Sequence, residues 1–260
     1  MTARRIGPVL RDLCVAWSDA TMVAPRLGPR DRGRLAMRLA RRTLRSLGVR
    51  VTVRGTALPA DEPALFVANH VSWLDVYVLN ALIDARFVSK SEVAAWPIVG
   101  AITRGFDAIF IVRDSARDAA RVKTAVAAAL RAGDRVVVFP EATTTDGTRL
   151  GRFHHAMFQA AIDAGVRVLP VALRYARPDG FVDTTPAFVG DMTFVSSLRR
   201  IMRASSVRAE VTFASPLAAE WWTRRGLAGA ARALVANALE LPGSAVDPAP
   251  ARRRIGRRAA

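Results

Sequence analysis

Apolar residues along this chain follow two periodicities, one typical of buried strands and one typical of helices. From residue 49 onward, short apolar runs bounded by turn-forming residues predict strands. These strands are expected at 49–54, 64–68, 86–89, 108–112, 135–139, 167–173, 187–190 and 208–214. Helices are expected between them at 72–83, 115–132 and 153–164, and at the end from about 217 to 241. Such alternation predicts an α/β fold, with a mixed, largely parallel sheet flanked by helices.

The first 48 residues form a separate helical segment in this pattern. Residues 9–24 and 31–47 both have a helical period. The second helix is amphipathic, and its basic side carries five arginines: Arg34, Arg38, Arg41, Arg42 and Arg45. Two interpretations fit it equally. It is either a helix lying in a membrane interface, or a surface helix whose apolar face packs on the core. We predict that residues 1–48 are an amphipathic membrane-interface segment.

Composition narrows the classes of partner. The chain has 260 residues, of which 51% are apolar, so it is long enough for one sizeable core. Its net charge of +17 favours anionic partners: nucleic acid, acidic lipid surfaces or phosphorylated substrates. Residues 242–260 are rich in Pro, Ala and Arg and predict a disordered polybasic tail. No run reaches the ~18 apolar residues of a membrane span, so any membrane contact is expected to be peripheral.

The strongest candidate for chemistry joins a predicted strand to a predicted helix at residues 69–75. Histidine exchanges a proton near neutral pH and is the usual general base, which makes His70 a candidate. Asp75 follows five residues later and can orient one ring nitrogen of that histidine, as the acid does in hydrolase triads. A structural alternative is a reciprocal capping pair between Ser72 and Asp75. Capping leaves Asn69 and His70 unexplained.

Two further segments follow predicted strands at the edge where open α/β sheets hold their sites. Glu141, Ala142 and Thr143 come after strand 135–139, and a carboxylate with hydroxyls there can orient a polyol head group. Ordinary turn chemistry is the alternative. Arg113 ends strand 108–112 and can hold a phosphate through two hydrogen bonds, or it can simply extend into water.

Other catalytic motifs are missing from the sequence. It has no G-x-S-x-G, no H-E-x-x-H, no paired cysteines, no P-loop and no G-x-G-x-x-G. No metal site is therefore expected. A base without a protein nucleophile suggests that the base acts directly on a substrate hydroxyl.

Four segments, taken in order, resemble the conserved blocks of glycerolipid acyltransferases, and most closely the lysophosphatidic acid acyltransferase (PlsC-like) branch. They are His70-x4-Asp75 and residues 109–113, 139–143 and 168–171. The similarity covers roughly residues 50–215 and makes residues 49–241 an acyltransferase domain. It implies that His70 is the base and that Asp75 orients it.

The same resemblance assigns the acceptor site. It implies that Arg113 and Glu141 bind the glycerol phosphate of the acceptor, together with the block neighbours Ala142 and Thr143. Lys90 matches a basic position just upstream of the second block.

Two positions depart from the family pattern. Ala142 stands where the family usually has glycine, and Asp107 where a glycine commonly precedes the block-two strand. An acid near the phosphate site disfavours a phosphate-bearing acceptor. Residues 143–148, Phe153 and residues 169–174 are also similar to branches that acylate lyso-ornithine lipids.

The resemblance implies an O-acyltransferase on the cytoplasmic face of the cell membrane. The acyl group would come from acyl-CoA or acyl carrier protein, with no other cofactor. The acceptor would be a lysophospholipid, with lysophosphatidic acid giving phosphatidic acid, or alternatively lyso-ornithine lipid. The anionic membrane surface is a further expected partner. The competing interpretations are a thioesterase that uses water and a non-enzymatic basic protein that binds lipid or nucleic acid, although we expect no nucleic acid partner.

Overall fold

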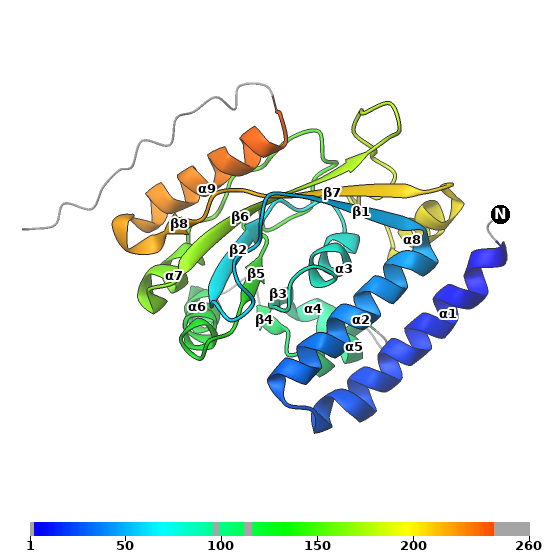
Figure 1. The fold of residues 1–260 in the computed structure, drawn as a ribbon, viewed down its shortest axis with the longest axis horizontal. Helices are drawn as coiled ribbons and strands as arrows, with labels where there is room; N and C mark the ends of the chain where they lie inside the picture. Colours follow the sequence, from blue (N-terminus) through cyan, green and yellow to red (C-terminus); the bar gives the residue numbers. More distant parts are fainter. Residues whose placement is uncertain (1–2, 96–98, 112–115, 242–260) are drawn as a thin grey trace, which may run out of the picture.

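The structure, a computed structural model, describes residues 3–95, 99–111 and 116–241, without the side chains of residues 3–5 and 116–119. Within these residues eight strands form one sheet in the order β1-β7-β6-β2-β5-β3-β4, and β8 pairs with β6 (Figure 1). The strands are β1 (Val49–Arg54), β2 (Ala64–Ala68), β3 (Arg86–Lys90), β4 (Ile109–Ile111), β5 (Val136–Val138), β6 (Arg167–Ala176), β7 (Val207–Phe213) and β8 (Leu217–Ala218). Neighbours run parallel except where β6 meets β7 and β8. The predicted mixed, largely parallel sheet is confirmed.

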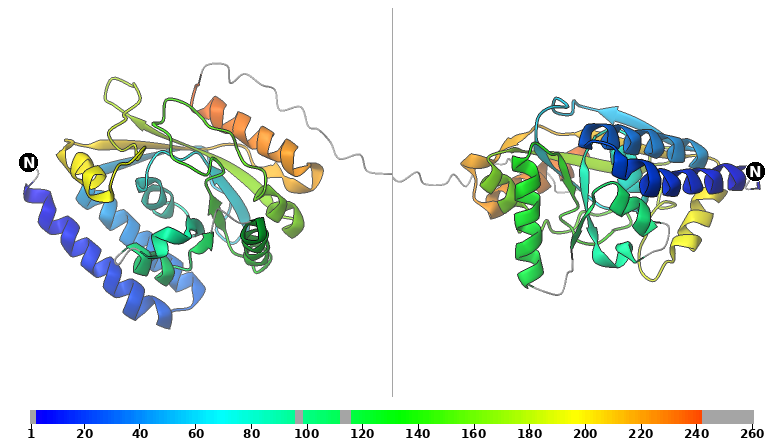
Figure 2. Two further views of the ribbon diagram at one scale, coloured as in Figure 1. Left: turned by 180° about the vertical axis from the view of Figure 1, so that it is seen from behind. Right: turned by 90° about the horizontal axis from the view of Figure 1, so that it is seen from below.

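Helices cover both faces of this sheet (Figures 1 and 2). One face packs against α6 (Ala116–Arg131), α7 (Phe158–Ala164) and α9 (Arg224–Ala238). The other packs against α2 (Pro29–Leu47), α3 (Leu74–Asn80) and α8 (Phe194–Arg203). The remaining helices are α1 (Ala3–Ser18), α4 (Ser91–Ala94) and α5 (Val99–Gly105), with short π and 3-10 turns at Asp19–Val23, Ala24–Arg26 and Ala219–Trp221.

The central strand β2 shows why the sheet needs helices on both sides. Phe66 points into the cluster shared with α2 and α3, whereas Leu65 and Val67 point into the cluster shared with α6 and α7. All five residues of β2 are fully buried. A strand buried on both faces reads as an unbroken apolar run, which is how it appears in the sequence.

Several predicted elements were wrong or incomplete. Residues 187–190 form no strand, because the N–H of Phe188 donates to Val71 O in a loop and not to a neighbouring strand. The helix expected from residue 153 begins only at Phe158, since the N–H of His154 bonds to Pro140 O. The segment expected as one helix from about 217 contains β8 and a 3-10 turn before α9. Helix α8 was not predicted, although Thr193 caps it through a bond from the N–H of Ser196.

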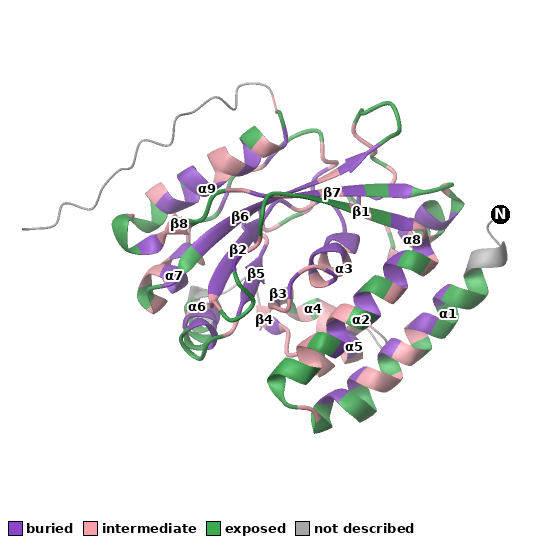
Figure 3. Cartoon of the chain, viewed as in Figure 1, coloured by how far each residue is buried: buried purple, intermediate pink, exposed green. Residues whose placement is uncertain are grey.

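The N-terminal helices α1 and α2 pack against each other, and the apolar side of α2 is buried. For α2 the structure therefore favours the core-facing interpretation over the membrane-facing one. Asp12 of α1 lies buried between the helices, where it accepts hydrogen bonds from Arg42 Nε (2.5 Å) and from the Ser46 hydroxyl. Large apolar residues are exposed instead on α1 and its following turn (Figure 3): Ile6, Leu10, Trp17, Met22 and Val23. Within the described residues, no helix is long and apolar enough to cross a membrane. The predicted tail at 242–260 lies outside them.

Candidate active site

Parallel strands bring the predicted site residues to one edge of the sheet. β2, β5 and β3 run in the same direction, so their carboxyl ends share this edge. His70 follows β2, Glu141 to Thr143 follow β5, and Lys90 ends β3. Arg113 lies outside the described residues.

His70 and Asp75 form the hydrogen-bonded pair that the sequence predicted. His70 Nδ1 lies 2.8 Å from Asp75 Oδ2. The Asp75 side chain is completely buried, whereas the His70 side chain remains 20% exposed. Among the described residues, Nε2 has no hydrogen-bond partner. An imidazole held through Nδ1 with Nε2 open to a cavity is arranged as a general base.

Asp75 also makes one half of the reciprocal capping pair that the sequence offered as an alternative, since Ser72 Oγ does not accept the N–H of Asp75 in return. Its Oδ2 accepts the backbone N–H groups of Val71 (2.7 Å) and Ser72 (2.9 Å), while Ser72 Oγ accepts the N–H of Leu74 at 3.2 Å. Capping and histidine orientation are therefore compatible, because one carboxylate oxygen serves both. The cap fixes the carboxylate before any substrate arrives.

Tyr175 completes the surroundings of Asp75. Its hydroxyl donates to Asp75 Oδ1 at 2.8 Å from the neighbouring strand β6. Burial, followed by the charge of Asp75 and this hydrogen bond, raises the pKa of Tyr175 well above its usual range. The hydroxyl therefore stays protonated and acts as a permanent donor to the carboxylate.

Glu141 supports the loop carrying His70. Its Oε1 accepts the N–H of His70 at 2.8 Å, and its Oε2 accepts the N–H of Gly151 at 2.6 Å. Only 5% of the residue is exposed, and it does not line the adjacent cavity. Burial raises the pKa of Glu141 above its ordinary value, against the opposing effect of these two hydrogen bonds. A side chain on Gly151 would begin 2.7 Å from Oε2, so this clamp requires glycine there.

The remaining restraints on His70 come from its chain neighbours. Its ring stacks on Phe139 with ring centres 4.0 Å apart, and its carbonyl accepts the N–H of Thr145 at 2.8 Å. Asn69 exchanges two hydrogen bonds with the backbone of Leu173, at 2.8 and 2.7 Å, and so extends the pairing of β2 with β6 through a side chain. This explains why asparagine precedes the histidine.

The two departures from the family pattern share one backbone property. Ala142 has φ of 61° and Asp107 has φ of 56°, a region that glycine occupies without steric cost. Asp107 precedes β4, at the sheet edge opposite the site, where its carboxylate pairs with Arg32. The expectation that it lies near the phosphate site was therefore wrong, and it gives no argument against a phosphate-bearing acceptor.

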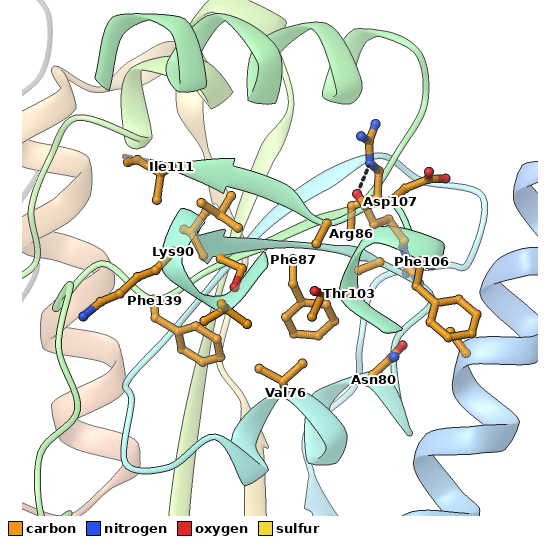
Figure 4. Close-up of a pocket in the computed structure, with 18 of the residues that line it drawn as sticks. Val76, Asn80, Arg86, Phe87, Lys90, Thr103, Phe106, Asp107, Ile111 and Phe139 are labelled. Carbon is orange, nitrogen blue, oxygen red and sulfur yellow. Dashed lines mark hydrogen bonds between the residues drawn. The ribbon is translucent and has the colours of Figure 1, made fainter. Parts of the chain in front are cut away.

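A cavity of about 880 Å³ opens beside His70 and runs along β3 (Figure 4). Lys90 and Phe139 line one end of it, and Arg86, Phe106 and Asp107 line the other. Apolar side chains dominate the length between them, including Val76, Phe87, Val88 and Ile102. Since a strand rises about 3.3 Å per residue, the five residues of β3 make this wall about 13 Å long. Such an elongated apolar cavity suits a hydrocarbon chain.

The structure brings together most of the predicted site residues. His70, Lys90, Ala142 and Thr143 line the cavity, with Asp75 and Glu141 buried behind them. Sequence reasoning missed Tyr175 and Gly151. Neither carried a signal, because Tyr175 meets Asp75 across 100 positions, and Gly151 meets Glu141 through an irregular loop ten positions long.

Comparison with known proteins identifies the family of this chain. A sequence model of the Acyltransferase family matches residues 50–174. The chain is 36% identical to a lyso-ornithine lipid O-acyltransferase of Pseudomonas aeruginosa, over 92% of each chain. It is also 36% identical to a 1-acyl-sn-glycerol-3-phosphate acyltransferase of Neisseria meningitidis, over 71% of this chain and 72% of the relative. The crystal structure of PlsC from Thermotoga maritima shares the fold, with a TM-score of 0.65, 18% identity and coverage of 92% of this chain and 97% of that one. The resemblance seen in the four blocks is thus confirmed, and the chain belongs to the lysophospholipid acyltransferase family.

Proposed function

We propose that this protein transfers a fatty acyl group from a thioester donor to the hydroxyl of a lyso-lipid. The observation that carries the proposal is the His70–Asp75 pair, whose open nitrogen borders an elongated apolar cavity. The family supplies the reaction class, and the cavity supplies a place for the acyl chain.

The reaction needs one base and no covalent enzyme intermediate. His70 Nε2 accepts the proton of the acceptor hydroxyl, and the oxygen attacks the thioester carbonyl carbon. Asp75 holds Nδ1–H and stabilises the imidazolium that forms. The C–S bond then breaks, and the leaving thiolate takes the proton from Nε2. No metal is needed in this sequence, and the thioester is the co-substrate.

The acyl chain occupies the cavity along β3. Its carbonyl lies at the His70 end, and its methyl end points toward Arg86 and Asp107. Polar groups there bind one another, since Arg86 Nε donates to the backbone carbonyl of Asp107 at 3.0 Å and Arg86 Nη1 pairs with the carboxylate of Asp134. A hydrocarbon makes no favourable contact with such a polar network, so the network limits how far the acyl chain enters the cavity.

The acceptor head group binds outside the cavity mouth, near Lys90 and Thr143. Lysophosphatidic acid is the acceptor implied by the resemblance of Arg113 and Glu141 to the phosphate-binding blocks. In this structure both carboxylate oxygens of Glu141 accept backbone N–H groups, so Arg113 remains the candidate for binding the phosphate. Lyso-ornithine lipid is the alternative acceptor, supported by the Pseudomonas relative, which matches over more of the chain than the Neisseria relative does.

The protein works as a peripheral enzyme at the cytoplasmic face of the membrane. The exposed apolar residues of α1, rather than the buried face of α2, are placed to enter a bilayer interface. Basic side chains along α2 and the polybasic tail add attraction to anionic lipid.

The test is a product analysis by mass spectrometry. Purified protein is incubated with acyl-CoA or acyl carrier protein thioester and with each lyso-lipid separately. We expect a diacylated product from at least one acceptor, and a loss of about a thousandfold or more in the His70→Ala variant. Circular dichroism checks that the variant is folded. Free fatty acid without any lyso-lipid would indicate a thioesterase, and retained transfer by His70→Ala would refute the base.

A further inference from the structure

A second, basic hollow lies behind the wall of the catalytic cavity. Its volume is about 230 Å³, and Arg152, His155, Arg225 and Arg232 line it, with residues of α9. The stretch 152–157 separates the two spaces. Arg152, Phe153 and His155 face the hollow, whereas His154, Ala156 and Met157 face the catalytic cavity.

The hollow is tied to the catalytic loop by a short series of hydrogen bonds. Arg232 of α9 donates to Leu150 O and Gly151 O, both at 2.8 Å. Gly151 N–H binds Glu141, whose other oxygen holds His70. A ligand bound in the hollow would therefore lie close to the catalytic loop, both along the chain and in space.

Positive charge here is not neutralised by the protein. Arg152, Arg224 and Arg225 are exposed, and none of them has a carboxylate partner among the residues that the structure describes. Partial burial, followed by the charges of Arg224, Arg225 and Arg152, lowers the pKa of His155. Arginines that lie close together without carboxylate partners form a surface that favours an anionic partner.

The acceptor lipid does not account for this charge. Its head group is assigned to the cavity mouth, on the other side of the 152–157 wall. The surface expected to meet the membrane is α1, and α9 lies on the opposite side of the molecule (Figures 1 and 2). The partner of the hollow therefore arrives from solution.

The size of the hollow and the residues that line it indicate whether its partner is a nucleotide or a protein. At about 230 Å³ the hollow is smaller than the ~300–1,000 Å³ pockets that bury drug-sized ligands. Its one phenyl ring, that of Phe153, is 5% exposed and offers no face for an adenine ring. Exposed arginines spread over a loop and a helix suit carboxylates spread over a protein surface.

We propose that Arg152, Arg224 and Arg225 form the docking surface for an acidic acyl carrier protein that delivers the thioester to His70. This inference rests on the proposed acyl transfer for its biological meaning, but binding tests it without turnover.

The experiment compares two double variants of the full chain. Arg224→Glu with Arg225→Glu reverses the docking surface. An acid in the first turn of α9 complements the helix dipole, so this variant is expected to fold. Arg50→Glu with Arg208→Glu is the control, because both arginines are exposed and face each other across β1 and β7, away from the hollow. The two variants change the net charge equally.

Binding of unloaded holo-acyl carrier protein is measured by fluorescence anisotropy at two salt concentrations. We expect the docking variant to raise Kd about tenfold or more and to weaken its salt dependence, and the control to change Kd less than about twofold. No binding by the wild type, or an equal effect of both variants, would overturn the proposal. Loss of coenzyme A binding with unchanged carrier binding would assign the hollow to the nucleotide instead.

Kinetics separate this inference from the reaction itself. With the docking variant, kcat/KM for the acyl carrier protein is expected to fall about tenfold further than kcat/KM for acyl-CoA. A wild type that binds the carrier in an Arg224- and Arg225-dependent way but transfers no acyl group would contradict the proposed function and leave the docking surface standing. Equal losses with both donors would overturn the docking surface and leave the acyl transfer standing.

Discussion

Replacing Asp75 with asparagine tests whether this residue stabilises a charged His70 or only caps a helix. The substitution keeps the three hydrogen bonds to Oδ2 and reverses the bond with Tyr175, whose hydroxyl donates to the aspartate. Oδ2 receives three donors, so the amide oxygen takes that position, and the amide nitrogen faces the oxygen of Tyr175, which can accept a hydrogen bond. The tautomer of His70 is thereby preserved, and the change that the imidazole experiences is the loss of the negative charge.

The size of the effect follows from the geometry. With Nδ1 and Oδ2 2.8 Å apart, the centres of the two delocalised charges are separated by roughly 4 Å. At an effective dielectric constant of about 20, their attraction is about 4 kcal/mol. Losing this attraction in the transition state lowers kcat about a thousandfold.

The assay follows thiol release from the acyl thioester at saturating lyso-lipid, with circular dichroism as a check of folding. Asp163→Asn is the matched control, because Asp163 is exposed and its side chain accepts a bond from Gln159 far from the site. A kcat within about threefold of the wild type in the folded Asp75→Asn variant would refute the charge argument and leave capping as the role of this residue.

Four other variants test the surroundings. Tyr175→Phe removes a buried donor to Asp75 and should lower the free energy of unfolding by about 1.5–3 kcal/mol in denaturant titrations. Ala142→Gly should stabilise the protein by about 1 kcal/mol in the same assay, because glycine relieves the positive φ; a destabilised variant would contradict this. Glu141→Gln tests pH dependence. Burial raises the pKa of Glu141 above 4.5, so the wild type should lose stability relative to the variant as pH rises through the raised pKa, in unfolding curves between about pH 4 and pH 8. Parallel curves would show that Glu141 does not titrate there. Val76→Trp fills the cavity wall and should shift donor preference toward shorter acyl chains in competition assays; unchanged preference would place the chain elsewhere.

The sequence predicted the strands well where the local apolar pattern and the burial in the fold agree. Strands such as β2 are apolar runs because both faces are buried, and the same burial makes them visible in the sequence. The irregular residues 153–157 were mispredicted as helical because the N–H of His154 bonds to Pro140 O, in a loop that meets them only in the fold. Helix α8 was missed although its cap, Thr193, is a local signal.

By itself, the sequence determined the α/β class, the His70–Asp75 pair and the family, because these depend on short-range spacing and on the order of the blocks. Only the tertiary structure decided how the pair is supported. Tyr175 reaches Asp75 across 100 positions and Glu141 reaches His70 across 71, and no local pattern records such contacts. It also decided which helix is free to meet a membrane. The apolar stripe of α2 looked available in the sequence, but packing against the core and α1 uses it and leaves the outer side of α1 exposed.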